Sequence, residues 1–339
     1  MAENKREKIL EIKGLKKYFP LKNGKVVKAV DNVSLELHKG ETLGLVGESG
    51  SGKSTIAYVL VGMYEATDGD MIYKGTNIAK TGLHRTKKQK GEIQIVFQDP
   101  GSSLNAKRTV GQSLMVPMEV HSKLTKEQRI ARGKELLEEV GLPAEFFDKY
   151  PRTLGGGERQ LVSVARALAT DPELIILDEP TSALDVSIQA KVISKLIELQ
   201  NEKDLAYLFI THDLSLMRNV ADKVAILYLG RLCEQAPAAD FFEKPLHPYT
   251  QMLLSSIPVA TAEEEEMKPV KILSEGEIPS PVNVPPGCAF HLRCKERLPI
   301  CDKERPVMKE VSPGHFVCCH LFNDVSACTA CAEERKAEE

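Results

Sequence analysis

A glycine-rich octapeptide, residues 47–54, constrains the fold of this chain more than any other stretch. Its sequence, GESGSGKS, satisfies every fixed position of the phosphate-loop pattern G-x-x-x-x-G-K-[ST]. A short apolar run, residues 41–46, precedes it and predicts a buried strand, and residues 55–63 predict a helix. Because a phosphate loop needs a strand before it and a helix after it, this context favours the motif over a chance glycine-rich turn.

The loop predicts a site for a nucleotide polyphosphate. Glycines let backbone N–H groups turn inward around the phosphates, and the N-terminus of the following helix adds positive potential. Lys53 can place its charge near the β- and γ-phosphates, and Ser54 can offer its hydroxyl to Mg²⁺. The loop residues expected to contact ATP are Gly47, Ser49, Gly50, Ser51, Gly52, Lys53, Ser54 and Thr55.

Length, charge and hydropathy argue against a nucleic-acid-binding, a membrane-spanning or a secreted protein. The 339 residues suffice for two or more domains, and the net charge of −3 gives no electrostatic argument for nucleic acid or an anionic membrane. No apolar run is long enough to span a membrane, and the charged N-terminus is unlike a signal peptide. We therefore expect a cytosolic protein whose membrane association comes through a partner.

Two carboxylates follow a strongly apolar run and predict catalytic chemistry. Residues 174–177 read as a buried strand that ends at Asp178 and Glu179. Ligands of open α/β sheets gather at the carboxyl ends of strands. Asp178 would then hold Mg²⁺ through water, and Glu179 would polarise the attacking water. The alternative is an acidic strand end that caps the next helix.

Four other features are ambiguous by themselves. A second glycine-rich turn, residues 154–158, leads into a helix and could bind an anion. Asp185 precedes an amphipathic helix as an N-cap would, and His212 ends a strand as either a γ-phosphate contact or a satisfied loop histidine. Phe19 or Tyr18 could stack on a base or be an ordinary sheet aromatic.

The basic segment 84–90 is expected to be a solvated loop.

Taken in order, these motifs resemble the nucleotide-binding subunit of an ABC transporter over about residues 8–320. The resemblance implies an α/β fold: an ABC-type P-loop NTPase with a RecA-like core, an antiparallel β subdomain, a helical insert and a small cysteine-rich C-terminal extension. The implied divisions are a core at 1–98 and 172–245, a helical signature subdomain at 99–171, an extension and linker at 246–284, a cysteine-rich tail at 285–322 and a disordered end at 323–339.

The resemblance also implies residue roles. Phe19 matches the adenine-stacking aromatic, with Tyr18 as the less favoured choice, and Gln98 matches the glutamine that senses Mg²⁺ and the membrane partner. Mg²⁺ would be held by Ser54, Gln98 and Asp178. Glu179 is similar to the catalytic base and His212 to the switch histidine. The residues expected to act in trans across a dimer are Gly155, Gly156, Gly157, Glu158 and Asp185.

The glycine-rich turn departs from the family pattern. The usual signature is Leu-Ser-Gly-Gly-Gln, whereas residues 154–158 read Leu-Gly-Gly-Gly-Glu. The missing serine hydroxyl would weaken the hold on the partner's γ-phosphate, by about 1.5–3 kcal/mol for a charge-assisted hydrogen bond. We therefore expect slow turnover at the partner's site and a heterodimer with a second, related ATPase subunit.

The C-terminal part indicates which kind of ABC transporter the chain resembles. Residues 245–258 resemble the extension found in importers of dipeptides, oligopeptides, nickel and related solutes. Seven of the eight cysteines lie after position 287, and the resemblance implies a [4Fe-4S] cluster. Cys318 rivals Cys319 for the fourth place, zinc is the competing metal, and free thiols are the remaining alternative. The implied cluster ligands are Cys288, Cys294, Cys301 and Cys319.

Two cysteine assignments stay outside the cluster. Cys233 lies in a strand-like segment and is expected to be a core residue, and Cys328 and Cys331 receive no role.

The sequence thus predicts the ATPase subunit of a peptide ABC importer, at the cytoplasmic face of the membrane. Its partners would be a related ATPase subunit, two membrane permeases and an extracytoplasmic solute-binding protein, and no nucleic acid. The alternatives are a subunit that binds ATP with little turnover, a nickel importer subunit and a soluble ABC ATPase outside transport. The solute cannot be read from this subunit, because the subunit does not touch it.

Overall fold

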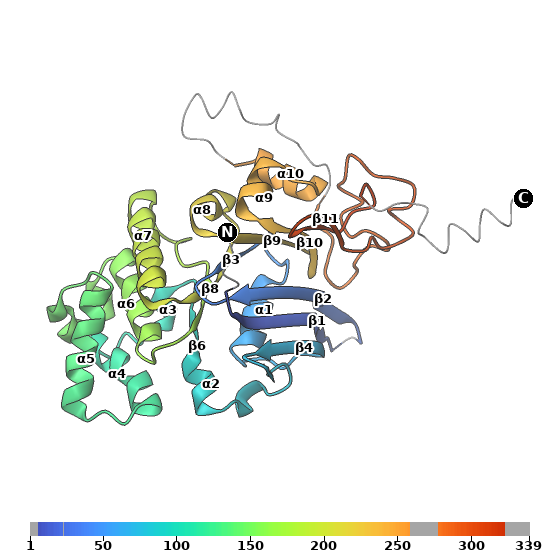
Figure 1. Ribbon diagram of the computed structural model, residues 1–339. Coiled ribbons are helices and arrows are strands. Elements are labelled where there is room, and N and C mark those ends of the chain that lie inside the picture. Colours follow the sequence, from blue (N-terminus) through green and yellow to red (C-terminus); the bar gives the residue numbers. More distant parts are fainter. Residues whose placement is uncertain (1–5, 23, 258–276, 323–339) are drawn as a thin grey trace, which may run out of the picture. The chain divides into compact units, whose positions relative to one another are not determined.

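The computed structural model describes residues 6–22, 24–257 and 277–322 (Figure 1). The chain forms two compact units, each assembled from discontinuous segments. Unit 1 comprises Met1–Lys17, Ser34–Gly44 and Ser54–Thr211, and unit 2 comprises Tyr18–Val33, Leu45–Lys53 and His212–Glu339. The statements below concern the described residues of each unit.

Unit 1 contains an antiparallel sheet with the strand order β2-β1-β4-β5. Strand β1 (Lys8–Pro20) pairs with β4 (Asp68–Tyr73), which pairs with β5 (Thr76–Asn77). β1 is longer than the sequence suggested, because alternation continues beyond Ile12 into a lysine-rich stretch. In the latter part of β2 (Val26–His38), buried and exposed residues alternate, which is the pattern of a sheet with one covered face.

The second sheet of unit 1 carries parallel strands. β6 (Ile93–Val96) pairs with β7 (Leu174–Asp178), and β7 pairs with β8 (Ala206–Thr211). Every residue of β7 and β8 is buried, as is every residue of β3 (Thr42–Val46). Parallel strands covered on both faces need continuous apolar runs, which is what the sequence shows. Because the strands are parallel, residues 98 and 178–179 follow strands that end at the same edge.

Several helices of unit 1 begin at a residue whose side chain caps the helix. In three of them a threonine and a glutamine three residues later form reciprocal capping boxes, at α2 (Lys87–Glu92), α4 (Val110–His121) and α5 (Lys126–Glu139). The others are α1 (Lys53–Leu60), α3 (Pro100–Ser103), α6 (Gly156–Leu168) and α7 (Val186–Lys203), with short 3-10 helices at Gly82–His84, Ala144–Asp148 and Pro151–Thr153.

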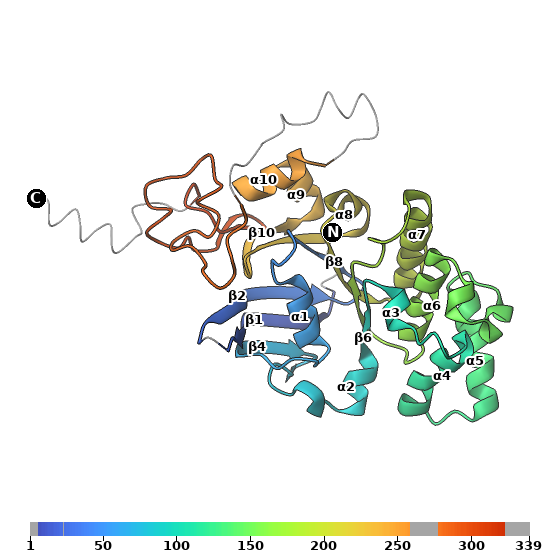
Figure 2. The same cartoon turned by 180° about the vertical axis from the view of Figure 1, so that it is seen from behind.

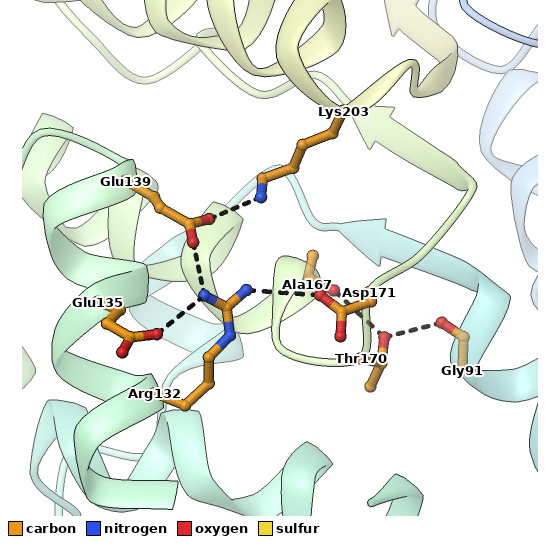
Figure 3. Close-up of polar contacts among 8 residues, drawn as sticks. All are labelled: Gly91, Arg132, Glu135, Glu139, Ala167, Thr170, Asp171 and Lys203. Atoms are coloured by element: carbon orange, nitrogen blue, oxygen red, sulfur yellow. Dashed lines mark hydrogen bonds and ion pairs between the residues drawn. The ribbon is translucent and has the colours of Figure 1, made fainter. Parts of the chain in front are cut away.

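A group of ion pairs ties helix α5 to neighbouring elements (Figure 3). Arg132 donates to Glu139 at 2.6 Å, and its other terminal nitrogen lies 3.4 Å from Asp171, in the turn after α6. Glu139 also pairs with Lys203, the last residue of α7, at 3.0 Å. Desolvation opposes the charged form of Glu139, but the two cations outweigh it and lower the pKa of that carboxyl. The network therefore joins the ends of three segments that are distant in sequence.

Unit 2 is built on an antiparallel sheet with the order β11-β12-β10-β9. The strands are β9 (Lys223–Tyr228), β10 (Arg231–Pro237), β11 (Lys309–Ser312) and β12 (His315–Val317), and β10 is labelled in the view from behind (Figure 2). The helices of this unit are α8 (Leu214–Val220), α9 (Ala238–Glu243) and α10 (Pro248–Ser255). The C-terminal hairpin β11–β12 thus extends the sheet that β9 and β10 begin.

A buried carboxylate connects these parts of unit 2. Glu234 on β10 is 0% exposed and accepts hydrogen bonds from the backbone N–H groups of Leu246 and His247 at 2.8 and 2.9 Å. Its Oε1 also lies 2.7 Å from Nε2 of His315 on β12. One side chain therefore fixes both the segment leading into α10 and the C-terminal hairpin.

The prediction of a solvated loop at residues 84–90 was right about the exposure of most of these residues, and wrong about the loop and about Arg85. Residues 87–92 form α2, and Arg85 is only 5% exposed. Its guanidinium donates to the carbonyls of Val59 at 2.7 Å and Ile78 at 3.3 Å, and to that of Leu60. The last carbonyls of a helix have no partner within it, and Arg85 supplies donors to the end of α1. Burial lowers the pKa of Arg85 to about 10.

In the described parts of the chain, no helix combines the length and the apolar character needed to cross a bilayer.

Candidate nucleotide-binding site

In unit 2 the phosphate loop adopts a conformation that requires glycine. Gly50 and Gly52 have φ of 77° and 104°, which side chains rarely permit. A Cβ on Gly52 would also lie 2.2 Å from the carbonyl oxygen of Ala29. The N–H of Gly230, which follows β9, donates to the carbonyl of Ser51 at 2.9 Å and anchors the loop to the sheet. The loop is thus held by backbone geometry.

Lys53 lies folded over the loop and is 5% exposed. Its Nζ donates to the carbonyl oxygens of Gly47 at 2.7 Å and Glu48 at 2.9 Å, and to Oγ of Ser51 at 3.3 Å. These three acceptors are neutral. A phosphate oxygen is a stronger acceptor for an ammonium group than any of them, because the hydrogen bond would be charge-assisted on both sides.

In unit 1 four predicted residues meet at the edge where β6 and β7 end. Ser54, in the first turn of α1, donates from Oγ to Oδ1 of Asp178 at 3.1 Å. Gln98, just after β6, donates from Nε2 to Oε2 of Glu179 at 2.9 Å. The hydroxyl and carboxylate oxygens of Ser54 and Asp178 are the ligand types that Mg²⁺ prefers, with phosphates and water completing its shell. These residues fit a magnesium-nucleotide site.

Glu179 has an unusual backbone conformation. Its φ is 48°, although it is not glycine, and its N–H donates to the carbonyl of Ile210 at 2.9 Å. A residue in this region costs about 1–3 kcal/mol, and such strain concentrates at functional sites. The fold therefore maintains the Glu179 carboxylate at the sheet edge in spite of a local energetic cost.

The glycine-rich turn of unit 1 is occupied by its own carboxylate. Gly155 is the N-cap of α6, and Oε2 of Glu158 accepts from the Gly155 N–H at 2.7 Å. Glu158 thus faces its own helix terminus, a contact that its motif position did not suggest. An anion that used the Gly155 N–H would have to displace this carboxylate.

Asp185 is the N-cap of α7. Its Oδ1 accepts from Ser187 Oγ at 2.8 Å and from the Ile188 N–H at 3.1 Å, and these bonds lower the pKa of Asp185. This is the structural role expected for an aspartate at that place.

Two further sequence candidates belong to unit 2. The hydroxyl of Tyr18 donates to Oδ1 of Asp31 at 2.7 Å, and burial together with this bond raises the pKa of Tyr18 to about 12. The Tyr18 hydroxyl is therefore engaged within the unit. Phe19, the favoured candidate to stack on a base, is half-buried near the end of β1. His212 directly follows the last residue of β8.

The described cysteines of the C-terminal part share one neighbourhood in unit 2. Burial raises the pKa of Cys288 to about 12 and that of Cys319 to about 11, and in each case nearby thiols raise it further. Burial likewise raises the pKa of Cys294, followed by the effect of Cys301. Cys318 also has its pKa raised by burial, to about 11, and donates from Sγ to the carbonyl of Pro306 at 3.2 Å.

No ready-made site for a single metal ion exists there. Within the described ranges, no three or more His, Cys, Asp or Glu side chains converge closely enough to hold one ion. Cys233 is a buried residue of β10, and Cys328 and Cys331 lie outside the described residues.

Sequence reasoning missed two residues that contact the phosphate loop. Arg293 pairs with the carboxylate of Glu48, and the hydroxyl of Tyr249 accepts from the Glu48 N–H at 3.1 Å. They lie 245 and 201 residues from Glu48, so no local pattern links them. The one available signal was an arginine next to Cys294, in a segment otherwise read only for its thiols.

Two family profiles match the chain. The profile described as "ABC transporter" matches residues 30–182, and "Oligopeptide/dipeptide transporter, C-terminal region" matches residues 233–301. Similar curated proteins include the oligopeptide transport ATP-binding protein AppF of Bacillus subtilis, 47% identical over 95% of this chain and 100% of AppF. The dipeptide transport ATP-binding protein DppF of Escherichia coli is 42% identical over 92% of this chain and 96% of its own length.

Solved structures give the same fold. The ATP-binding cassette MJ0796, a dimer in a post-hydrolysis state bound to ADP and Pi, has a TM-score of 0.62 and 27% identity, covering 68% of this chain and 99% of its own. The cbiO1 protein of Clostridium perfringens, part of the transporter complex cbiONQ, has a TM-score of 0.61 and 26% identity, covering 70% of this chain and 92% of its own.

Proposed function

The chain belongs to the ABC transporter ATPase family and carries the C-terminal region of the oligopeptide and dipeptide transporters, and on this premise we propose that it is the ATPase subunit of a peptide importer. It couples the binding and hydrolysis of ATP to the movement of a peptide through membrane permeases. For the nucleotide chemistry, the observation that carries the proposal is the 3.1 Å contact between Ser54 and Asp178. It joins the hydroxyl next to the phosphate-loop lysine to the acidic end of β7.

In the proposed mechanism the polyphosphate is bound by the loop amides of residues 47–53 and by Lys53, which exchanges its neutral carbonyl acceptors for phosphate oxygens. Phe19 stacks on the base. Ser54, Asp178 and Gln98 hold Mg²⁺, which neutralises charge on the β- and γ-phosphates when bound.

Glu179 is the proposed general base. It accepts a proton from the water that attacks the γ-phosphate, and Gln98 fixes the carboxylate through the 2.9 Å hydrogen bond. His212 contacts the γ-phosphate and responds to its loss. In this proposal the positive φ of Glu179 serves to direct the carboxylate toward the nucleotide.

The proposed assembly is a heterodimer with a related ATPase subunit, in which residues 155–158 and Asp185 face the partner's nucleotide. Two permeases would hold this pair at the cytoplasmic face of the membrane, and an extracytoplasmic binding protein would deliver the peptide. The proposed functional division is a core at 1–98 and 172–245, a helical signature subdomain at 99–171 and a C-terminal extension from 246. In the curated names of similar proteins, AppF and DppF are oligopeptide and dipeptide transport proteins, which supports the choice of solute class.

We further propose that Cys288, Cys294, Cys301 and Cys319 hold a [4Fe-4S] cluster. A tetrahedral zinc ion, with Zn–S bonds of about 2.3 Å, would draw its thiolates to within about 4 Å of one another. In a cluster each thiolate binds a different iron atom, so the sulfurs stay further apart. The four cysteines are the thiols that the resemblance to the peptide importers assigns to the cluster, and zinc is the alternative that the metal analysis below decides.

Metal analysis of anaerobically purified protein tests the cluster. We expect iron and acid-labile sulfide in equal amounts, and a brown colour that Cys294→Ser removes. A colourless protein that contains zinc, or one that contains no metal, would contradict the cluster without touching the ATPase proposal.

The central test uses two variants of the nucleotide site in the assembled importer. Glu179→Gln should keep the affinity for Mg-ATP and lower turnover by about 100-fold or more, which is typical for loss of a general base. Lys53→Ala should lower the affinity for Mg-ATP and abolish peptide uptake. Mass spectrometry of the solute that co-purifies with the importer then identifies the peptide class.

The ATPase proposal fails if the wild-type assembly shows no affinity for Mg-ATP, or if Lys53→Ala leaves uptake intact. Unchanged turnover in Glu179→Gln would instead favour a subunit that binds ATP without hydrolysing it.

A further inference from the structure

The phosphate loop of unit 2 carries an acidic residue that is paired with the cysteine-rich tail. Arg293 donates from Nη1 to Oε2 of Glu48 at 2.8 Å and from Nη2 to Oε1 at 3.0 Å. The two parallel bonds form the bidentate arrangement that an arginine fork and a carboxylate favour. The pair therefore fixes the orientation of both side chains as well as neutralising their charges.

The ion pair of Arg293 and Glu48 is largely buried and lies against aromatic rings. Its side chain is 8% exposed, against 23% for Glu48, so the pair is largely shielded from water. The guanidinium lies 5.8 Å from the ring centre of Tyr228 on β9 and 5.7 Å from that of Phe290. These cation–π contacts and low exposure make the pair stronger than a surface ion pair of the same length.

A second tie reaches the same residue from helix α10. The N–H of Glu48 donates to the hydroxyl of Tyr249 at 3.1 Å, and the ring of Tyr249 packs on Tyr228 and Phe290 with centroids 4.7 and 5.2 Å apart. The backbone N–H of Glu48 is thus bound by Tyr249 and its carboxylate by Arg293, and both partners pack in one aromatic group, which comprises Tyr228, Tyr249 and Phe290.

We propose that Arg293 is a positioning residue for ATP binding, which neutralises Glu48 and holds the phosphate loop in its binding conformation. The proposal rests on the proposed function, since it concerns the same polyphosphate. A carboxylate in the second position of the loop opposes a polyanionic ligand, and Arg293 both neutralises its charge and fixes its orientation. The tail, through one side chain, sets the affinity of the loop for nucleotide.

A purely structural role of Arg293 predicts something different. If Arg293 only anchored the tail, its loss would impair the protein whatever residue stood at position 48. If it neutralises Glu48, removing the carboxylate as well should restore binding. The double variant Glu48→Ala with Arg293→Ala therefore separates the two roles.

The experiment measures equilibrium binding of Mg-ATP and hydrogen exchange of the amides at residues 47–53, in the full chain with its partner subunits. Arg293→Ala should weaken Mg-ATP binding about fivefold to tenfold, as expected for one uncompensated charge near the phosphates. The double variant should return to within about twofold of wild type. The Mg-ATP affinity of Arg293→Lys should lie between those of wild type and Arg293→Ala, because lysine keeps the positive charge but cannot form the two parallel hydrogen bonds.

Arg297→Ala is the matched control. Arg297 is a tail arginine that pairs with Asp302 at 2.6 Å, but it is 42% exposed and has no contact with the loop among the described interactions. Its removal should leave Mg-ATP binding unchanged. In both Arg293→Ala and the double variant, exchange of the loop amides without nucleotide should be faster than in wild type.

Three results would overturn the proposal. The first is wild-type affinity for Mg-ATP in Arg293→Ala, and the second is an equal loss of that affinity in the single and double variants. The third is hydrogen exchange of the loop amides at the wild-type rate in both variants. Failure of the proposed function looks different, because wild-type protein would then not bind Mg-ATP. In that case the exchange data alone decide whether Arg293 positions the loop.

Discussion

Two glycines of the phosphate loop are required for different physical reasons. Gly50 has a positive φ, but a Cβ there would meet nothing within 4 Å, so only backbone strain opposes a side chain. Gly52 has a positive φ and also packs against the backbone of Ala29. The motif pattern treats both only as glycines at given spacings, whereas the structure separates strain from close approach.

The substitution Gly52→Ala should therefore be far more damaging than Gly50→Ala. The first must move the carbonyl of Ala29, and we expect a loss of at least about 3 kcal/mol in the free energy of unfolding or no folded protein. The second should cost about 1–2 kcal/mol, the strain of a left-handed alanine. Urea unfolding of the two variants checks this, and equal losses would contradict the close approach.

At the scale of elements, helix α10 begins at a buried histidine. Nδ1 of His247 accepts from the N–H of Tyr249 at 3.0 Å, which caps the helix, and its ring lies 5.9 Å from that of Phe290. Burial lowers the pKa of His247 to about 4, from 6.5. The folded state therefore keeps the imidazole neutral where the unfolded chain would protonate it.

Because the imidazole of His247 can be protonated, the free energy of unfolding should depend on pH. Between pH 6.5 and about 4 the unfolded state binds more protons at His247, so the free energy of unfolding should fall as the pH drops through this range. The loss should reach at most about 3 kcal/mol, and the full contribution should be present above pH 6.5. His247→Asn keeps a capping acceptor without titrating, so its stability should vary less over this range. An equally steep profile in that variant would refute the assignment.

The ion pairs at helix α5 allow a matched comparison of two glutamates on one helix. Glu139 pairs with Arg132 and Lys203, whereas Glu135 is 61% exposed and, among the described ion pairs, has Arg132 as its single partner, at 3.4 Å (Figure 3). Glu139→Ala should lower the free energy of unfolding by about 1–2 kcal/mol, because it removes two charge-assisted contacts between elements. Glu135→Ala should cost less than about 0.5 kcal/mol. Denaturant unfolding measures both, and the reverse order would show that the network contributes little.

At the scale of the whole molecule, we expect the altered signature to make the two nucleotide sites of the proposed dimer unequal. Residue 155 lacks a hydroxyl, and its N–H is bonded to Glu158. A Cβ at Gly155 would meet the Glu158 side chain no closer than 3.5 Å, at Oε2, so the Cβ of a serine fits there without a clash.

Gly155→Ser should therefore raise turnover at the partner's site, by about threefold or more for one restored hydrogen bond to a charged group. Steady-state ATPase assays of the assembled importer measure this, with Lys53→Ala present in both samples to silence this chain's own loop. Turnover that stays the same would show that the signature is not limiting.

Local patterns carried the assignment to the ABC family. The phosphate loop, the strand that ends at Asp178 and the order of the motifs are matters of spacing along the chain. Short apolar runs likewise predicted the buried strands β3, β7 and β8. The comparisons confirm the family and the ABC cassette fold. These features could be predicted from the sequence because each consists of residues that are close together along the chain.

The tertiary structure decided which side chains meet. It buried Arg85 against the end of α1 and paired Glu48 with Arg293 across 245 residues. Neither contact has a sequence signature, because each depends on how separate segments pack and on which polar groups that packing leaves in need of a partner. Sequence spacing fixes what lies near along the chain, and only the folded packing fixes what lies near in space.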